Sequence, residues 1–276
     1  MIDIVRQGAR LPALGLGTWD MRGEEAVRAV RRAIEIGYRH IDTAQMYENE
    51  AEVGRAIAES GLDRGALWLT TKIDNDAHSF ERVKSSTEES LRKLGTEYVD
   101  LLLIHWPVFS DAPLAETLDA MAELRYAGRI RHMGVSNFSS ALIAETVDEL
   151  GHEILCNQVE YHPYLGQKAV LAACAARGIV VTAYCPVVRG ELGGDAVLGE
   201  IGRRHGKSAA QVALRWLVQQ DGVAAIPKAA SEKNARANFE IFDFSLSVAE
   251  IAAVHGLARG RRLVDAAGEW AEWDPD

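Results

Sequence analysis

Eight apolar runs of strand length recur along the chain, and helical patterns fill the gaps between them. The runs lie at about 14–19, 38–42, 67–72, 99–104, 130–135, 155–160, 179–184 and 223–226. Residues 101–104 are continuously apolar, which is typical of a parallel strand covered on both faces. From Ala26 to Ile34 the apolar residues follow helical spacing, with charged residues on the opposite face. Strict alternation of strand and helix predicts an α/β fold, a (β/α)8 TIM barrel.

Two segments lie outside this repeat. Residues 2–14 place Gln7-Gly8 between short apolar stretches, which predicts an N-terminal β-hairpin across the bottom of the barrel. The tail from about Gly256 contains Trp270 and Trp273 without clear periodicity, and we expect it to form a C-terminal loop over the active site. No linker rich in Pro, Gly or Ser divides the chain, so residues 1–276 are predicted to form one domain.

The composition limits the partners that the chain can have. Its formal net charge is −10 and its isoelectric point is near 5.4, so no basic face is expected to attract nucleic acid or a membrane surface. The three cysteines form no CxxC pair, and no stretch resembles a membrane span or a signal peptide. We therefore expect a reduced, cytoplasmic protein that acts on a small molecule.

Three polar residues stand at the carboxyl ends of apolar runs: Asp42, Lys72 and His105. In a barrel these side chains converge on the face that carries active sites, and the turn after the first run adds Tyr47. A lysine beside Tyr47 would lower the pKa of the phenol, while Asp42 would keep that lysine charged. A neutral His105 could then orient a carbonyl oxygen. The alternative is an ordinary ion pair of Asp42 and Lys72 that joins two strands.

A series of motifs resembles a known family. In order, they are GLGTW at 15–19, IDTAQMYENE at 41–50, TTK at 70–72, LLLIHWP at 101–107, GVSNF at 134–138, NQVEYHP at 157–163, AYCP at 183–186 and IPK at 226–228. Their order and spacing resemble the aldo-keto reductases over essentially the whole chain. The ending at 261–274 is similar to that of the bacterial 2,5-diketo-D-gluconate reductase B (methylglyoxal reductase) branch. The resemblance implies an NAD(P)H-dependent oxidoreductase whose catalytic residues are Asp42, Tyr47, Lys72 and His105, with Tyr47 as general acid.

The same resemblance implies a cofactor site and a substrate pocket. Ser136, Asn137 and Gln158 would bind the nicotinamide carboxamide, and Tyr184 would stack on the ring, leaving one ring face for hydride transfer. Further implied cofactor contacts are Thr18, Trp19, Asp42, Cys185, Pro186, Val187, Ile226, Pro227, Lys228, Ala229, Asn234 and Asn238. The implied substrate pocket contains Trp19, Asp74, Trp106, His162 and Trp270.

Some positions depart from the family pattern. Asp74 and Asp76 occupy a loop where many members have an aromatic residue, which predicts an open, negative mouth that favours neutral dicarbonyls over keto acids. That loop also contains His78, but we expect a solvated loop and no metal site. Ala229 and Asn234 replace a serine and an arginine associated with the 2′-phosphate. Lys228 remains, so we expect NADPH to be preferred by a reduced margin, with NADH acceptance left open.

These observations predict a monomeric enzyme that uses NADPH to reduce small aldehydes, ketones or dicarbonyls to alcohols. Two other classes of function remain as alternatives. One is a catalytically idle, cofactor-binding regulatory subunit, which the complete set of four residues argues against. The other is a metal-dependent barrel hydrolase, but its usual His-x-His on the first strand is replaced here by His40-x-Asp42.

Overall fold

The computed structural model describes residues 2–107, 111–265 and 273–274. The strands are β1 (Asp3–Arg6), β2 (Ala9–Pro12), β3 (Leu16–Gly17), β4 (His40–Asp42), β5 (Trp68–Ile73), β6 (Val99–Ile104), β7 (Ile130–Ser136), β8 (Cys156–Glu160), β9 (Val180–Tyr184) and β10 (Val223–Ala225). The α-helices are α1 (Gly23–Ile36), α2 (Glu50–Glu59), α3 (Phe80–Leu94), α4 (Leu114–Tyr126), α5 (Ser140–Ala144), α6 (Lys168–Ala176), α7 (Ala196–His205), α8 (Ala209–Val218), α9 (Glu232–Phe239) and α10 (Val248–His255). Short helical turns are η1 (Gln45–Tyr47), η2 (Arg64–Ala66), η3 (Glu145–Glu149) and η4 (Val188–Gly194).

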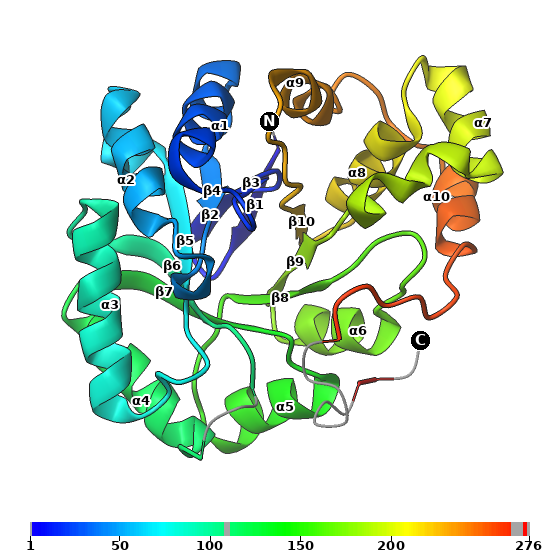
Figure 1. Cartoon of the computed structure of the whole chain (residues 1–276). Coiled ribbons are helices and arrows are strands. Elements are labelled where there is room, and N and C mark those ends of the chain that lie inside the picture. The colour runs from blue at the N-terminus through cyan, green and yellow to red at the C-terminus, as the bar shows by residue number, and fades with distance from the viewer. Residues whose placement is uncertain (1, 108–110, 266–272, 275–276) are drawn as a thin grey trace.

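Strands β3 to β10 form one parallel sheet in chain order within the described residues, and the sheet closes on itself. Backbone hydrogen bonds join its edges, from Gly15 N to Ala225 O at 2.9 Å and from Ala225 N to Ala13 O at 2.8 Å. A Cβ on Gly17 would lie 2.7 Å from the carbonyl oxygen of Ile226, so only glycine permits this close approach. Figure 1 shows the helices arranged around the strands. The predicted (β/α)8 barrel is confirmed.

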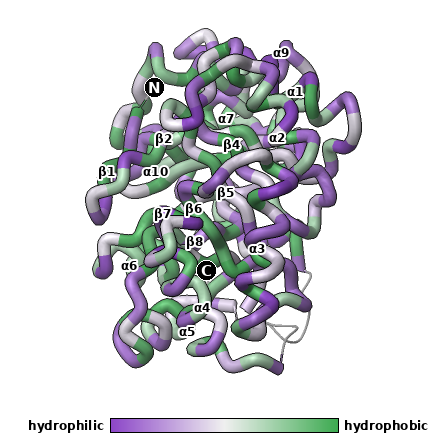
Figure 2. Tube along the Cα trace, turned by 90° about the vertical axis from the view of Figure 1, so that its left-hand side faces the viewer, coloured by the Kyte–Doolittle hydropathy of each residue, from purple (hydrophilic) through white to green (hydrophobic). Residues whose placement is uncertain are grey.

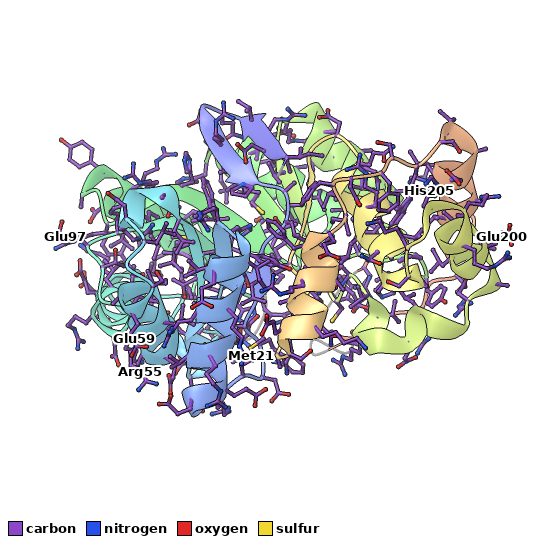
Figure 3. The ribbon with its side chains drawn as sticks, turned by 90° about the horizontal axis from the view of Figure 1, so that it is seen from above. Met21, Arg55, Glu59, Glu97, Glu200 and His205 are labelled. Carbon is purple, nitrogen blue, oxygen red and sulfur yellow. The ribbon has the colours of Figure 1, made fainter. Side chains whose placement is uncertain are left out.

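The strands begin and end close to the predicted positions, except that β3 is shortened to two residues. Every residue of β6 is buried, as its apolar run predicted. Helix α1 buries Ala26, Val30 and Ala33 against the barrel, and Figure 2 shows hydrophobic residues along the central strands. Charged pairs lie on the outer surface, such as Arg55 with Glu59 on α2, both labelled in Figure 3. The core thus lies in the barrel and beneath the inner faces of the helices.

The expected hairpin is present and covers the amino-terminal end of the barrel. Strands β1 and β2 pair in antiparallel register across Gln7 and Gly8, which have φ angles of 47° and 78°. The side chain of Gln7 donates to Ile154 O at 3.0 Å, and Arg6 donates to both carboxylate oxygens of Asp221 at 2.7 Å. Because Ile154 and Asp221 lie in the loops that enter β8 and β10, the hairpin lies opposite the catalytic face.

Helix α8 begins with a capping box. Ser208 caps α8 by accepting a hydrogen bond from the backbone of Gln211, and the Gln211 side chain returns a contact to Ser208. This capping box satisfies the first turn of the helix. No helix among the described residues is long and apolar enough to span a membrane.

Candidate active site

The predicted catalytic side chains meet at the carboxyl ends of the strands. Asp42 is the last residue of β4, Lys72 lies near the end of β5, His105 follows β6 and Tyr47 ends η1. The Lys72 ammonium donates to Asp42 Oδ1 at 2.6 Å, to Thr43 O at 2.8 Å and to the Tyr47 hydroxyl oxygen at 3.2 Å. Lys72 is 0% exposed and Asp42 is 1% exposed, so this ion pair is shielded from water. The lysine therefore connects the carboxylate to the phenol.

The charges of this group are set by burial and by pairing. Burial opposes the charge on Lys72, but attraction from Asp42 and Tyr47 raises the pKa of Lys72 above its usual 10.5. Burial raises the pKa of Tyr47 above its usual 10.0, and the opposing effect of Lys72 does not cancel this rise. Lys72 acts in the expected direction and lowers the pKa of Tyr47, but desolvation of the phenolate, which the sequence did not reveal, raises the pKa by more. The phenol is consequently protonated at neutral pH.

His105 is held in the neutral form beside Tyr47. Burial and the nearby Lys72 ammonium hold the pKa of His105 well below its usual 6.5. Its ring meets the Tyr47 ring edge-on, with centroids 5.6 Å apart. The buried Nδ1 atom of His105 has no hydrogen-bond partner among the described residues. Neutral imidazole can donate one hydrogen bond without adding positive charge, which agrees with the role predicted for it.

The predicted nicotinamide-binding residues form a second connected group. The Tyr184 hydroxyl donates to Asn137 Oδ1 at 2.8 Å, and Asn137 Nδ2 donates to the backbone oxygen of His105 at 2.9 Å. Ser136 Oγ donates to Gln158 O at 2.8 Å. Gln158 Nε2 donates to Asp42 Oδ2 at 2.7 Å, which joins this group to the carboxylate that binds Lys72. Ser136 and Tyr184 end β7 and β9 and Asn137 follows β7, whereas Gln158 is the middle residue of β8.

The remaining cofactor candidates surround the strand ends between β3 and β10. Thr18 Oγ1 donates to Asp42 O at 2.9 Å, and Trp19 is 48% exposed. Cys185 has a φ of 50°, so the backbone turns sharply as it leaves β9. Pro186, Val187, Ile226, Pro227 and Ala229 lie in the segments that follow β9 and β10, and Asn234 and Asn238 lie on α9. Their positions agree with an elongated ligand site, although their contacts with a cofactor stay predictions.

Lys228 already has a partner that the sequence did not reveal. Its ammonium donates to Asp20 O at 3.0 Å and lies 3.4 Å from the Asp20 carboxylate, in the loop after β3. Asp20 adopts a φ of 59°, an uncommon left-handed backbone conformation that presents it toward β10. If Lys228 binds a 2′-phosphate as predicted, that phosphate would compete with Asp20 for the ammonium.

The predicted pocket residues have different environments. Trp106 is 5% exposed and meets Trp273 edge-on at 6.2 Å, so the described part of the tail does reach the mouth. Asp74 receives a hydrogen bond from Asn75 N at 2.7 Å. His162 is 0% exposed and binds Glu160 through Nε2 at 2.8 Å. The prediction that His162 lines the open pocket is therefore not met, because a buried carboxylate holds the ring. Trp270 lies outside the described residues.

Two buried polar residues that organise the site were missed. Asn49 accepts from Thr43 Oγ1 at 2.7 Å and donates to the backbone oxygens of Thr18 and Met21, both at 2.9 Å. It thus fastens the turn that bears Tyr47 to the loop after β3. Glu160 accepts hydrogen bonds from the backbone of the tail. Asn49 lies in the motif at 41–50 and Glu160 in the motif at 157–163, so these motifs were the signal from which both residues could have been found.

One hollow among the described residues lies away from the candidate catalytic side chains. It measures about 370 Å³ and is lined by α2, α3 and the segments that enter β5 and β6, including Arg64 and Tyr98. These are the amino-terminal ends of the strands, and no candidate catalytic residue lines the hollow. Convergence of charged and polar side chains, rather than cavity size, therefore locates the candidate site. No group of three or more described His, Cys, Asp and Glu residues could hold a metal ion.

Comparisons with known proteins agree with this geometry. The model of the Aldo/keto reductase family matches residues 13–259. An aldo-keto reductase of Mycolicibacterium smegmatis is 40% identical over 94% of each chain, and methylglyoxal reductase DkgB of Escherichia coli O157:H7 is 39% identical over 96% of this chain and 99% of its own.

Solved structures give the same result. A crystal structure provisionally named 2,5-diketo-D-gluconic acid reductase B has a TM-score of 0.95 and 48% identity, over 99% of this chain and 97% of its own. A Bombyx mori aldo-keto reductase in complex with NADP has a TM-score of 0.92 and 34% identity, with coverages of 99% and 97%. The chain therefore belongs to the aldo/keto reductase family, and it is an NAD(P)H-dependent oxidoreductase.

Proposed function

We propose that this enzyme reduces small aldehydes, ketones or dicarbonyls to alcohols with NADPH, and that Tyr47 donates the proton. The observation that carries the proposal is the contact of the Lys72 ammonium with both Asp42 and the Tyr47 hydroxyl. Burial keeps the Tyr47 phenol protonated, so it carries the proton that carbonyl reduction requires. The adjacent ammonium stabilises the phenolate once that proton has left.

The residues present fit a nicotinamide cofactor. Tyr184 is half-buried and offers an aromatic surface, while its hydroxyl is held by Asn137. Gln158 donates its amide NH₂ to Asp42, which turns its carbonyl oxygen away from that carboxylate. Lys228 lies exposed past β10, where a phosphate can reach it. The bound cofactor would supply the hydride.

The protein's own residues would stabilise and neutralise the negative charge that develops on the carbonyl oxygen. Tyr47 would transfer its proton to that oxygen, and Lys72 would stabilise the phenolate through the 3.2 Å contact. Asp42 keeps Lys72 charged in a site without water access. Neutral His105 would donate a hydrogen bond to the same oxygen and so fix its direction before the proton moves.

The test is an NADPH-oxidation screen over a panel of carbonyl compounds, followed by Tyr47→Phe. We expect turnover to fall by roughly 10²–10⁴-fold, the usual effect of losing a general acid, while NADPH binding is retained. Tyr38→Phe is the matched control, because it removes another buried phenol, which donates to Ala235 O. Turnover above about a tenth of wild type in Tyr47→Phe, in a chemistry-limited assay, would disprove the assignment. A chain that binds NADPH but oxidises none with any carbonyl would instead be a regulatory subunit.

We further propose that residues 1–276 form one domain and that the enzyme is a cytoplasmic monomer. The closed sheet supports a single domain, because its first and last strands meet through hydrogen bonds across the whole chain. Sedimentation equilibrium would test the monomer: a mass near 30.2 kDa is expected, and a concentration-dependent doubling would contradict it.

A further inference from the structure

The Lys72 ammonium is oriented by two residues at the end of β4. It donates to Asp42 Oδ1 at 2.6 Å and to Thr43 O at 2.8 Å, and its contact with the Tyr47 hydroxyl oxygen is longer, at 3.2 Å. An ammonium has three N–H donors, so these contacts use all of them. The two shorter contacts fix the direction of the third donor. The peptide that joins Asp42 to Thr43 therefore determines how the ammonium faces the phenol.

The side chain of Asn49 holds this peptide from both sides. Its Oδ1 accepts from the Thr43 hydroxyl at 2.7 Å. Its Nδ2 donates to Thr18 O at 2.9 Å, and Thr18 donates to Asp42 O through its backbone nitrogen at 3.0 Å and its hydroxyl at 2.9 Å. Asn49, Thr43 and Thr18 are each 0% exposed, so water has little access to these hydrogen bonds. One buried amide thus fixes the backbone of both residues that bind the lysine.

The position of Asn49 at a helix start does not account for these contacts. Asn49 is the N-cap residue of α2, where an asparagine usually accepts a hydrogen bond from the first turn of its own helix. Among the described residues of α2, none donates such a bond to this side chain. The amide instead also donates to Met21 O at 2.9 Å, in the loop after β3. Its three hydrogen bonds therefore connect the loops after β3 and β4 rather than cap the helix.

We propose that Asn49 is a positioning residue, which acts on the reaction through Thr43 and Lys72 and makes no contact with the reacting atoms. The inference rests on the proposed carbonyl reduction with Tyr47 as the acid, and it adds a residue to that function. Without the amide, the peptide between Asp42 and Thr43 is free to rotate, and the ammonium is no longer directed at the phenol. Small displacements of a group that stabilises developing charge reduce the rate strongly.

The first test measures steady-state kinetics with a carbonyl substrate that the screen identifies. We expect Asn49→Ala and Thr43→Val each to lower kcat by roughly ten- to a hundredfold, while KM for the carbonyl changes by less than about threefold. Thr43→Ser keeps the hydroxyl and should retain kcat within about threefold of wild type. The double variant should lose no more than Asn49→Ala alone, because both substitutions break the same link.

Gln219→Ala is the matched control. Gln219 also joins two segments through a side-chain amide, since it donates to Leu246 O at 2.8 Å and accepts from Leu246 N at 2.9 Å. It directly follows α8 and precedes β10, so it lies toward the end of the barrel opposite the catalytic face. Its substitution should lower Tm without lowering kcat.

A second test observes the ammonium itself and does not require turnover. With nitrogen-15 in the lysine side chains, the Lys72 ammonium should give an NMR signal protected from exchange with water, because the side chain is 0% exposed. Lys72→Met identifies the signal by its loss. Asn49 reaches Lys72 through Thr43, so a shifted or broadened signal in Asn49→Ala reports a transmitted displacement. Gln219→Ala should leave the signal unchanged.

Values of kcat within about threefold of wild type in both Asn49→Ala and Thr43→Val would overturn the inference. A loss confined to KM would also overturn it, and so would a Thr43→Ser variant as slow as Thr43→Val, because the hydroxyl would then be irrelevant. If wild type reduces no carbonyl, the proposed function fails and the ammonium signal decides. A change of that signal in Asn49→Ala but not in Gln219→Ala supports the positioning role, and an unchanged signal rejects it.

Discussion

The buried pair of Asp42 and Lys72 can be tested by removing its charges singly and together. In Lys72→Met the Asp42 carboxylate loses the ammonium at 2.6 Å but remains 1% exposed, with Gln158 Nε2 still donating at 2.7 Å. In Asp42→Asn the Lys72 ammonium is left without a counter-charge in a fully buried position. Each single substitution thus leaves one buried charge without its partner.

The magnitude follows from that stranded charge. Breaking a buried ion pair costs about 3–5 kcal/mol, which for a domain of this size corresponds to a fall in Tm of roughly 6–20 °C. The double variant carries no stranded charge, so it should cost at least about 2–3 kcal/mol less than the sum of the single variants. All three variants should be inactive, since each removes either the contact to Tyr47 or the charge balance behind it.

Equilibrium unfolding of the apo protein in urea at pH 7 would measure the cycle. The control is Lys84 with Glu123, an exposed pair at 2.9 Å, for which the same cycle should give a coupling below about 1 kcal/mol. Additive costs at Asp42 and Lys72, or a Lys72→Met variant within about 1 kcal/mol of wild type, would refute the reasoning. The reasoning predicts that the double variant is more stable than the sum of the two single substitutions implies, yet remains inactive like both of them.

Two further predictions concern the cofactor and pH. Lys228→Met should weaken the affinity for NADPH by roughly ten- to a hundredfold and leave the affinity for NADH nearly unchanged, whereas Asp20→Asn should increase the affinity for NADPH by removing a competing carboxylate. Fluorescence titrations with both cofactors would measure these affinities. Equal losses of affinity for the two cofactors in Lys228→Met would exclude a contact with the phosphate. The pKa of His105 in the folded protein is depressed below 6.5, so the unfolded chain binds this proton at a higher pH than the folded chain does. The free energy of unfolding should therefore decline as the pH falls below about 6.5, by at most about 1.4 kcal/mol per pH unit. His105→Gln should give a shallower decline in urea midpoints, and parallel curves would contradict this.

The fold was largely predictable because it follows from a pattern that barrel geometry enforces. A parallel strand covered on both faces must be apolar, and the helix that returns the chain must have one apolar face. Polar residues at the strand ends then meet on one face, so Asp42, Lys72 and His105 could be grouped without coordinates. The shortening of β3 was not predictable from hydrophobicity, since Leu14 and Trp19 at the ends of the run are as apolar as Leu16, and closure depends on backbone approach at Gly17.

Other features depend on which groups become buried or paired, and a linear pattern does not contain that information. The pKa of Tyr47 was predicted from one neighbouring charge, but desolvation is the larger effect. Asp20 lies 208 positions from Lys228 in sequence, so their pairing was invisible. His162 was assigned to the pocket by analogy, but it is held by Glu160 beneath the tail. In each case the missing information was a contact between residues distant in the chain or a degree of burial.

The carboxylate of Asp42 serves both halves of the site. One oxygen binds Lys72 and the other accepts from Gln158, whose backbone oxygen in turn accepts from Ser136 Oγ and Asn137 N. A change at Gln158 therefore alters the contacts of Asp42, which binds Lys72 behind the proposed proton donor Tyr47, as well as the group proposed to bind the carboxamide. Tyr184→Phe, in contrast, removes only the hydroxyl that donates to Asn137 and leaves the Asp42 contacts intact. Substitution of Tyr184 should therefore affect cofactor binding without affecting proton transfer, whereas substitution of Gln158 should affect both.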